Sequence, residues 1–163
     1  MDITIRQAKM EDARFIVVAE QEIAQEPGYF CSQPFELNEQ KVKQTIGSTQ
    51  GGYFVAEKGG HIVGHVFLER LHLQSIRHVA QLTIGVHKGY QEQGIGTLLM
   101  EKIIEWAKQS DTIEKIELNV RASNTRAIAL YKKMGFYEEG CLKKRIKIGD
   151  QYIDDILMAL HVC

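Results

Sequence analysis

The stretch Tyr90-Gln91-Glu92-Gln93-Gly94-Ile95-Gly96-Thr97 decides the fold class, because it joins a strand-like run to a long amphipathic helical pattern. Two glycines one residue apart leave backbone N–H groups uncovered by side chains where the helix dipole begins. A helix start of this kind suits a pyrophosphate. We therefore predict a phosphate-binding loop at 90–97. A glycine-rich helix start without a ligand is the plainer alternative.

Two better-known phosphate loops fit this stretch poorly. A Walker A loop requires Gly-Lys-Ser/Thr at its end, and although Gly89 and Gly94 have the right spacing, Ile95 and Gly96 follow. A dinucleotide-binding fingerprint requires a third small residue, and Leu99 stands at that position. The residues at these motif positions therefore disfavour both nucleotide hydrolysis and dinucleotide binding.

Outward from the loop, the chain alternates between two hydrophobic periods. A period of two predicts strands, and a period near 3.6 predicts helices. The expected strands are 2–7, 52–57, 61–71, 78–86, 113–120, 136–147 and 151–161, and the expected helices are 10–24, 37–47, 94–109 and 124–134. This order predicts an α/β fold with a mixed sheet. At 163 residues and 44% hydrophobic composition, we expect one domain spanning 1–163.

Composition narrows the function classes. A formal net charge of −1 provides no basic field for nucleic acid. No apolar run reaches the ~18 residues that span a bilayer, and the N-terminus lacks a signal-peptide core. The cysteines Cys31, Cys141 and Cys163 include no C-x-x-C pair, which favours reduced thiols and a cytoplasmic location. No histidine or cysteine cluster predicts a metal site.

Two segments resemble a known family. The pattern Gln91-x-x-Gly94-x-Gly96 is similar to the acetyl-CoA pyrophosphate loop of the GCN5-related N-acetyltransferase (GNAT) family. Residues 124–136, Asn-Thr-Arg-Ala-Ile-Ala-Leu-Tyr-Lys-Lys-Met-Gly-Phe, resemble that family's N-x-x-A-x-x-L-Y-x-k-x-G-F segment. The resemblance implies a GNAT fold, in which a mixed, mostly antiparallel sheet of about seven strands is flanked by about four helices. It also implies acetyl-CoA as co-substrate and no metal.

The resemblance implies roles for particular residues. Tyr131 would protonate the departing CoA thiolate, since a phenol with a pKa of ~10 can donate to a thiolate of similar basicity. A backbone N–H near Val86 would support the thioester oxyanion. Gly85 beside it is compatible with a bulge or with tight packing. The residues expected to bind acetyl-CoA are Ile84, Val86, Gln91, Glu92, Gln93, Gly94, Ile95, Gly96, Thr97, Asn119, Asn124, Tyr131 and Lys133.

The general base and the acceptor site are less well defined. The segment Val120-Arg121-Ala122-Ser123-Asn124 resembles ribosomal-protein N-terminal alanine acetyltransferases, in which a catalytic Glu precedes this Val. Asn119 stands there and cannot act as that base. Glu117 shares its strand face and is the candidate base, with a surface glutamate as the alternative. We expect Tyr29, Phe30 and Asp154 to contact the acceptor.

These observations predict an N-acetyltransferase that moves acetyl directly from acetyl-CoA to a primary amine. A small molecule such as an amino acid is the first choice of acceptor, and a protein N-terminus or lysine is the second. A non-catalytic acyl-CoA-binding regulatory module is the alternative from another class. We expect no nucleic-acid or membrane partner. A homodimer is compatible with the family, and the sequence leaves the oligomeric state open.

Overall fold

Seven strands form one mixed sheet in the computed structural model, which describes residues 2–25 and 36–163. The strand order is β1-β2-β3-β4-β5-β7-β6. The strands are β1 (Ile3–Gln7), β2 (Tyr53–Lys58), β3 (His61–Arg70), β4 (Val79–Val86), β5 (Lys115–Arg121), β6 (Tyr137–Ile148) and β7 (Gln151–His161). The helices are α1 (Ala13–Gln25), α2 (Glu39–Ser48), α3 (Ile95–Lys108) and α4 (Thr125–Lys133), with short 3₁₀ turns at Met10–Asp12 and Gln74–Ile76. The predicted fold class is confirmed.

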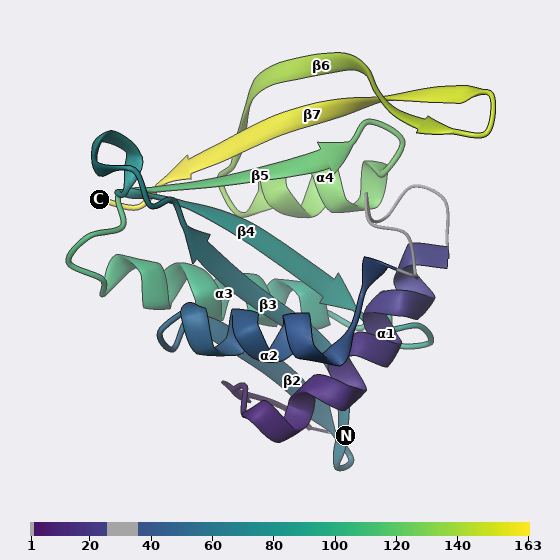
Figure 1. The fold of residues 1–163 in the computed structure, drawn as a ribbon, viewed down its shortest axis with the longest axis vertical. Coiled ribbons are helices and arrows are strands. Elements are labelled where there is room, and N and C mark those ends of the chain that lie inside the picture. Colours follow the sequence, from purple (N-terminus) through teal and green to yellow (C-terminus); the bar gives the residue numbers. More distant parts are fainter. Residues whose placement is uncertain (1, 26–35) are drawn as a thin grey trace.

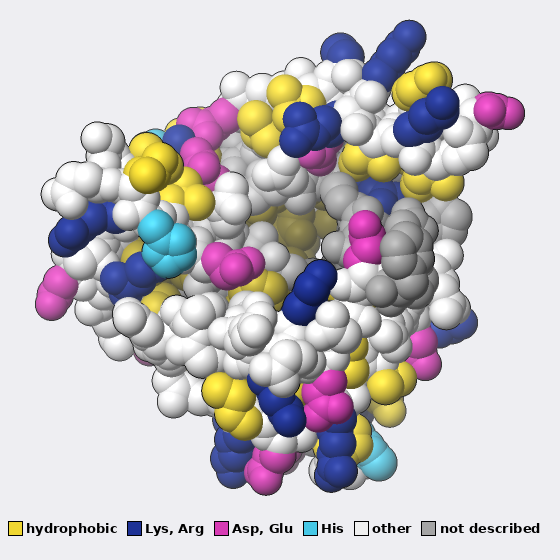
Figure 2. All heavy atoms as spheres, viewed as in Figure 1, with side chains coloured by type: hydrophobic (Ala, Val, Ile, Leu, Met, Phe, Trp, Pro, Cys, Tyr) yellow, Lys and Arg dark blue, Asp and Glu magenta, His cyan; other side chains and the backbone are white. Residues whose placement is uncertain are grey.

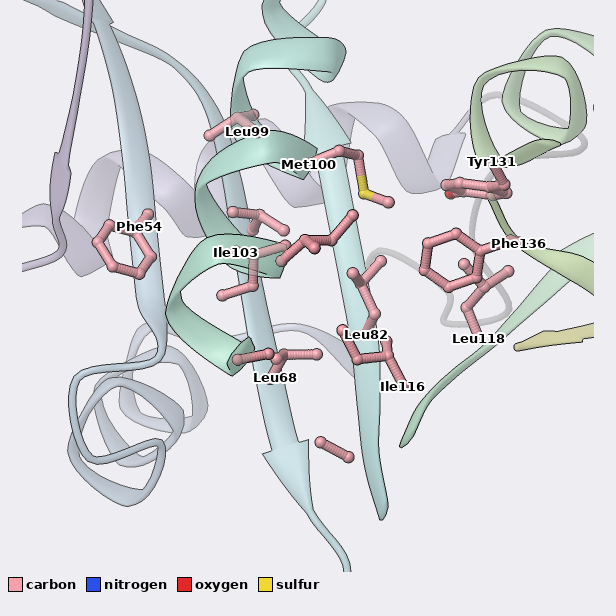
Figure 3. Close-up of a cluster of buried hydrophobic side chains, with 14 of the residues drawn as sticks. Phe54, Leu68, Leu82, Leu99, Met100, Ile103, Ile116, Leu118, Tyr131 and Phe136 are labelled. Atoms are coloured by element: carbon pink, nitrogen blue, oxygen red, sulfur yellow. The ribbon is translucent and has the colours of Figure 1, made fainter. Parts of the chain in front are cut away.

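Two helical layers enclose the sheet (Figure 1). Leu68, Leu82 and Ile116 point to one face and pack against Leu99 and other residues of α3, as the close-up in Figure 3 shows. The opposite face packs Tyr53, Val55 and Phe67 against α1 and α2. Because side chains alternate along a strand, β2 and β3 supply buried side chains to both layers. The sheet therefore separates an α1/α2 side from an α3/α4 side.

A hairpin joins β2 and β3, which correspond to the expected strands 52–57 and 61–71. Gly59 and Gly60 both have positive φ, at 59° and 81°. A two-residue turn with positive φ at both positions matches the twist of the flanking strands, and glycine adopts it without steric cost. The hairpin places β3 in the middle of the sheet, where it pairs with β4 along seven residues.

β4 and β5 are parallel neighbours that stay together over a short distance only. Their pairing covers Val79–Gln81 and Lys115–Glu117, although both strands continue beyond it. Figure 1 shows the two strands diverging toward their C-terminal ends. Beyond this pairing, β4 still pairs with β3 and β5 with β7, but the edges of β4 and β5 that face each other are no longer paired. The sheet therefore has an opening at its centre.

The opening does not result from a bulge at Gly85. Pairing between β3 and β4 keeps one register through His65 and Gly85, so the bulge interpretation is wrong. Gly85 instead packs tightly. A methyl group added to it would lie 2.8 Å from His65 Cε1 and 3.2 Å from Ile23 Cδ1. The glycine is required because an imidazole lies directly against the strand.

Among the described helices, none is both long and apolar enough to cross a bilayer. The described residues also contain no group of three or more histidine, cysteine, aspartate or glutamate side chains arranged to hold a metal ion.

Candidate active site

A cavity of about 480 Å³ occupies the opening between β4 and β5. Its lining includes Thr83 and Glu69, which face the α1/α2 side, and Gly96 and Leu130 on the α3/α4 side. The cavity therefore extends through the sheet from one helical layer to the other. Figure 2, viewed from the α1/α2 side, shows a hollow near the middle of this face with hydrophobic side chains at its floor.

The N-terminus of α3 differs from those of α2 and α4. Asn38 caps α2 by accepting from Lys41 N at 2.9 Å, and Asn124 caps α4 by accepting from Ala127 N at 3.2 Å. Gly94 begins α3 with φ of 80° and no side-chain cap. The first four N–H groups of a helix have no intrahelical acceptor, so those of α3 remain available to a ligand. Together with the helix dipole they form a site for an anion.

Gly96 keeps the space beside this helix start open. A methyl group added to it would lie 3.1 Å from Leu130 Cδ2 and would close the gap between α3 and α4. Lys88 and Arg126 line the same end of the cavity, and Arg126 Nη2 donates to Glu92 Oε1 at 2.9 Å. Gln91 shapes the loop, since its Oε1 accepts from Gly89 N at 3.1 Å. Open amides, a glycine gap and two cations fit the pyrophosphate of CoA.

Tyr131 lies on α4 at the inner end of the cavity (Figure 3). Its ring packs against Phe136 with 6.0 Å between the centroids, and only 7% of the residue is exposed. Within the described residues its hydroxyl makes no hydrogen bond. Burial raises the pKa of Tyr131 to about 12, so the phenol keeps its proton at neutral pH. These features suit a proton donor.

On β5, the structure separates two residues that the sequence places on one face. Asn119 lines the cavity, and its Nδ2 donates to Asp155 Oδ2 at 2.9 Å. Glu117 is outside the lining. Its Oε2 lies 3.0 Å from Lys115 Nζ, which also binds Glu139 of β6 at 3.0 Å. The structure therefore does not bring Glu117 together with Tyr131.

The other predicted residues divide in a similar way. The lining includes Ile84, Val86, Gln91, Glu92, Gly94, Gly96, Thr97 and Asn124. Gln93 lies outside it and accepts from Lys58 Nζ at 2.6 Å, Ile95 is buried in the core, and Lys133 is exposed. Asp154 is also outside, held by Lys143 Nζ at 3.3 Å and Lys144 N at 2.8 Å. Tyr29 and Phe30 fall outside the described residues.

Four lining residues on the α1/α2 side were not singled out from the sequence. They are Ile23 of α1, Glu69 of β3, and Gln81 and Thr83 of β4. Alternation alone places Gln81 and Thr83 opposite the core residue Leu82. Glu69 is identifiable only once its pairing with Gln81 is known. The carboxylate of Glu69 gives the acceptor side of the cavity a negative charge.

Comparison with known proteins defines the class. Residues 15–136 match the model of the Acetyltransferase (GNAT) family, and the chain belongs to this family. It is an acetyl-CoA-dependent N-acetyltransferase. The chain is 29% identical over 161 residues to an L-amino acid N-acetyltransferase from Escherichia coli, covering 97% of each chain. It is 34% identical over 120 residues to an N-alpha-acetyltransferase from Sulfurisphaera tokodaii, covering 68% of this chain and 69% of that protein.

The fold also matches that of solved structures. The crystal structure of a GNAT-family acetyltransferase from Streptococcus pneumoniae superposes with a TM-score of 0.89 at 25% identity, covering 99% of this chain and 100% of that one. The predicted family and its co-substrate, acetyl-CoA, are confirmed.

Proposed function

We propose that this protein transfers acetyl from acetyl-CoA to the α-amine of a small amino acid-like molecule. The observation that carries the proposal is the cavity through the sheet, with an anion site at α3 on one side and the carboxylate of Glu69 on the other. Acetyl-CoA supplies an activated acetyl thioester when bound. The uncapped N-terminus of α3 binds its pyrophosphate, and Tyr131 supplies the proton that the leaving sulfur requires.

A second cavity of about 410 Å³ supports an amino acid as acceptor. It lies between α1, α2 and the sheet and shares Glu69 and Thr83 with the first cavity, so the two adjoin. Its lining also includes the cation Lys41 and the polar Asn38 and Thr45 of α2. A zwitterion has its ammonium attracted to Glu69 and its carboxylate to Lys41, which suits a free amino acid.

A protein N-terminal amine is the second candidate acceptor, because the relative from Sulfurisphaera tokodaii is named an N-alpha-acetyltransferase. Asn119 weakens that alternative, since it replaces the catalytic Glu expected from the resemblance to ribosomal-protein acetyltransferases. We further propose that the enzyme acts in the cytoplasm as a single domain. A homodimer is proposed as its assembly, and light scattering of the purified protein tests it.

The test of the proposal is CoA thiol release with each of the standard L-amino acids, simple polyamines and short peptides as acceptors. Saturable release with amino acids supports the proposal, and release with peptides alone overturns the small-molecule acceptor. Tyr131→Phe should lower kcat by about 100-fold or more, the contribution of a general acid, with the affinity for acetyl-CoA unchanged. The matched control is Tyr152→Phe, since Tyr152 is 53% exposed on β7 and lies outside the cavity. Equal loss of binding and turnover in Tyr131→Phe would indicate a structural role instead.

A further inference from the structure

Three buried ionisable residues form a line behind β4. Glu20 of α1 is 8% exposed, His65 of β3 is fully buried, and His87, just after β4, is 6% exposed. His65 Nδ1 lies 3.1 Å from His87 Nε2, and His87 Nδ1 lies 3.0 Å from the carbonyl oxygen of Ile62. Glu20 Oε1 lies 3.3 Å from His65 Nε2. Buried groups of this kind are costly unless they are paired, so the arrangement of protons along the line matters.

The hydrogen-bond partners determine which ring nitrogen of each histidine carries a proton, beginning at the Ile62 carbonyl. The Ile62 carbonyl can only accept, so His87 carries its proton on Nδ1. Burial lowers the pKa of His87 to about 3, which keeps it neutral and leaves its Nε2 as an acceptor. His65 must then donate from Nδ1. A neutral His65 therefore presents a bare Nε2 lone pair to Glu20.

A neutral His65 beside an ionised Glu20 places two acceptors face to face at this end of the line. His65 Nε2 is within ion-pair distance of the carboxylate yet outside hydrogen-bond geometry, and it is one of the buried nitrogens without a hydrogen-bond partner among the described residues. A hydrogen bond between His65 Nε2 and Glu20 requires one more proton than these two residues hold. In that state the Glu20–His65 pair can accept one proton and share it in a hydrogen bond.

The pair adjoins the site where the acceptor amine must lie. Glu20 lines the second cavity together with Glu69 and Thr83, and these two residues also line the acetyl-CoA cavity. Ile23, one turn after Glu20 on α1, lines the acetyl-CoA cavity. A methyl group on Gly85 would meet both the His65 ring and Ile23, so the pair lies directly behind the strand that holds the thioester.

Other charged or titratable groups surround the pair. Tyr53 of β2 stacks on His65 with 6.4 Å between the centroids, and burial, together with the charges of Glu20 and Glu69, raises the pKa of Tyr53 far above its ordinary value. Tyr53 therefore stays a neutral phenol. Glu69 of β3 and Lys41 of α2 line the same cavity as Glu20, and His87 contacts the other ring nitrogen of His65. Glu69 is an exposed carboxylate in that cavity, so it is the alternative candidate for the general base.

We infer that Glu20 is the general base for the acceptor amine and that His65 and His87 are positioning residues that prepare it to receive the proton. The inference rests on the proposed function, because it requires an amine acceptor. An N–H bond of the substrate ammonium breaks and an O–H bond forms on Glu20, shared with His65 Nε2. The freed lone pair forms a bond to the acetyl carbon, the C–S bond breaks, and sulfur takes the Tyr131 proton. The second amine proton restores the Tyr131 hydroxyl, and the proton on Glu20 leaves to solvent.

The kinetic test compares Glu20→Gln with Glu22→Gln, whose parent residue lies on the same helix but is exposed. Using the best amino acid acceptor, Glu20→Gln should lower kcat by about 100-fold or more at neutral pH. The deficit should shrink as pH rises toward the ~10 at which the free amine forms without a base. Acetyl-CoA affinity by calorimetry should stay unchanged. A rise in KM with full kcat, or an effect seen in Glu69→Gln instead, would overturn the inference.

The spectroscopic test needs no turnover. NMR of the ¹⁵N-histidine-labelled enzyme should show both His65 and His87 as neutral Nδ1–H tautomers, assigned with His65→Gln and His87→Gln and controlled with the exposed His61→Gln. A proton on His65 Nε2 in the free enzyme would overturn the inference even if the enzyme is active. If no amine is acetylated but the tautomers are as stated, the proposed function fails and the general base fails with it, while the proton arrangement stands.

Discussion

Substituting Gly85 by alanine should destabilise the protein although it adds only one methyl group. The new atom would lie 2.8 Å from His65 Cε1 and 3.2 Å from Ile23 Cδ1. Neither neighbour can move freely, because His65 is fully buried and bonded to His87, and Ile23 is buried on α1. Overpacking of this kind costs about 1–3 kcal/mol. The change to alanine also offsets part of this cost, because glycine within a strand destabilises a protein by about 0.5–1 kcal/mol relative to alanine.

From the middle of each range, the expected net loss is about 1 kcal/mol in the free energy of unfolding, which lowers Tm by about 2–4 °C for a chain of this length. Thermal denaturation followed by circular dichroism measures it. Gly140→Ala is the matched control, because a methyl group there would meet only Leu157 Cδ1 at 3.8 Å, an ordinary contact. Adding His65→Ala to Gly85→Ala should remove the clash, so the two changes should be less than additive. Equal Tm values for both alanine variants, or simple additivity in the double variant, would refute the packing argument.

Two further predictions concern the stability that Asp12 and the cap of α4 contribute. Burial opposes ionisation of Asp12, but Arg6, at 2.8 Å, and the Lys9 N–H outweigh it and hold the pKa of Asp12 below its ordinary value of 3.8. A lowered pKa stabilises the fold above the pKa of the unfolded state, and this stabilisation is lost as pH falls. The free energy of unfolding of the wild type, measured by urea denaturation, should therefore decrease more steeply below about pH 4 than that of Asp12→Asn. Parallel curves for the two proteins would contradict this. Replacing Asn124 by alanine removes the cap of α4 and should cost about 1 kcal/mol by the same assay, whereas Asn124→Asp should retain most of the stability.

Sequence periodicity predicts α3 well because this helix buries one clear face, formed by Ile95, Leu99, Met100, Ile103, Ile104 and Ala107. The expected helix at 94–109 and the observed α3 at Ile95–Lys108 differ by one residue at each end. The loop before it is equally recognisable, since two glycines one residue apart at a helix start are typical of a backbone that binds an anion. Tyr131 is identifiable from its motif, and the structure places it at the cavity.

The acceptor side is harder to predict because it depends on partners that are distant in sequence. Glu117 and Asn119 share a strand face, but Glu117 pairs with Lys115, which also binds Glu139, while Asn119 reaches the cavity. Nothing in the β5 sequence indicates that β6 brings a glutamate to Lys115. The structure places Asp154 outside the cavity for a similar reason, since the backbone N–H of Lys144 across the β6–β7 hairpin binds its carboxylate.

Asn119 lines the acetyl-CoA cavity and Glu20 lines the second cavity that adjoins it, and together they account for a departure from the family pattern. An amide on β5 cannot accept the proton of an ammonium, so an enzyme with Asn119 needs its base elsewhere. The α1 side provides a carboxylate 3.3 Å from His65 Nε2, a buried nitrogen that makes no hydrogen bond within the described residues. Gly85 allows the imidazole to lie against β4, and His87 fixes the orientation of its lone pair. A strand glycine and two histidines that are far apart in sequence thus act on the same carboxylate. All three are needed to position Glu20 of α1 and its neighbour His65 for proton transfer.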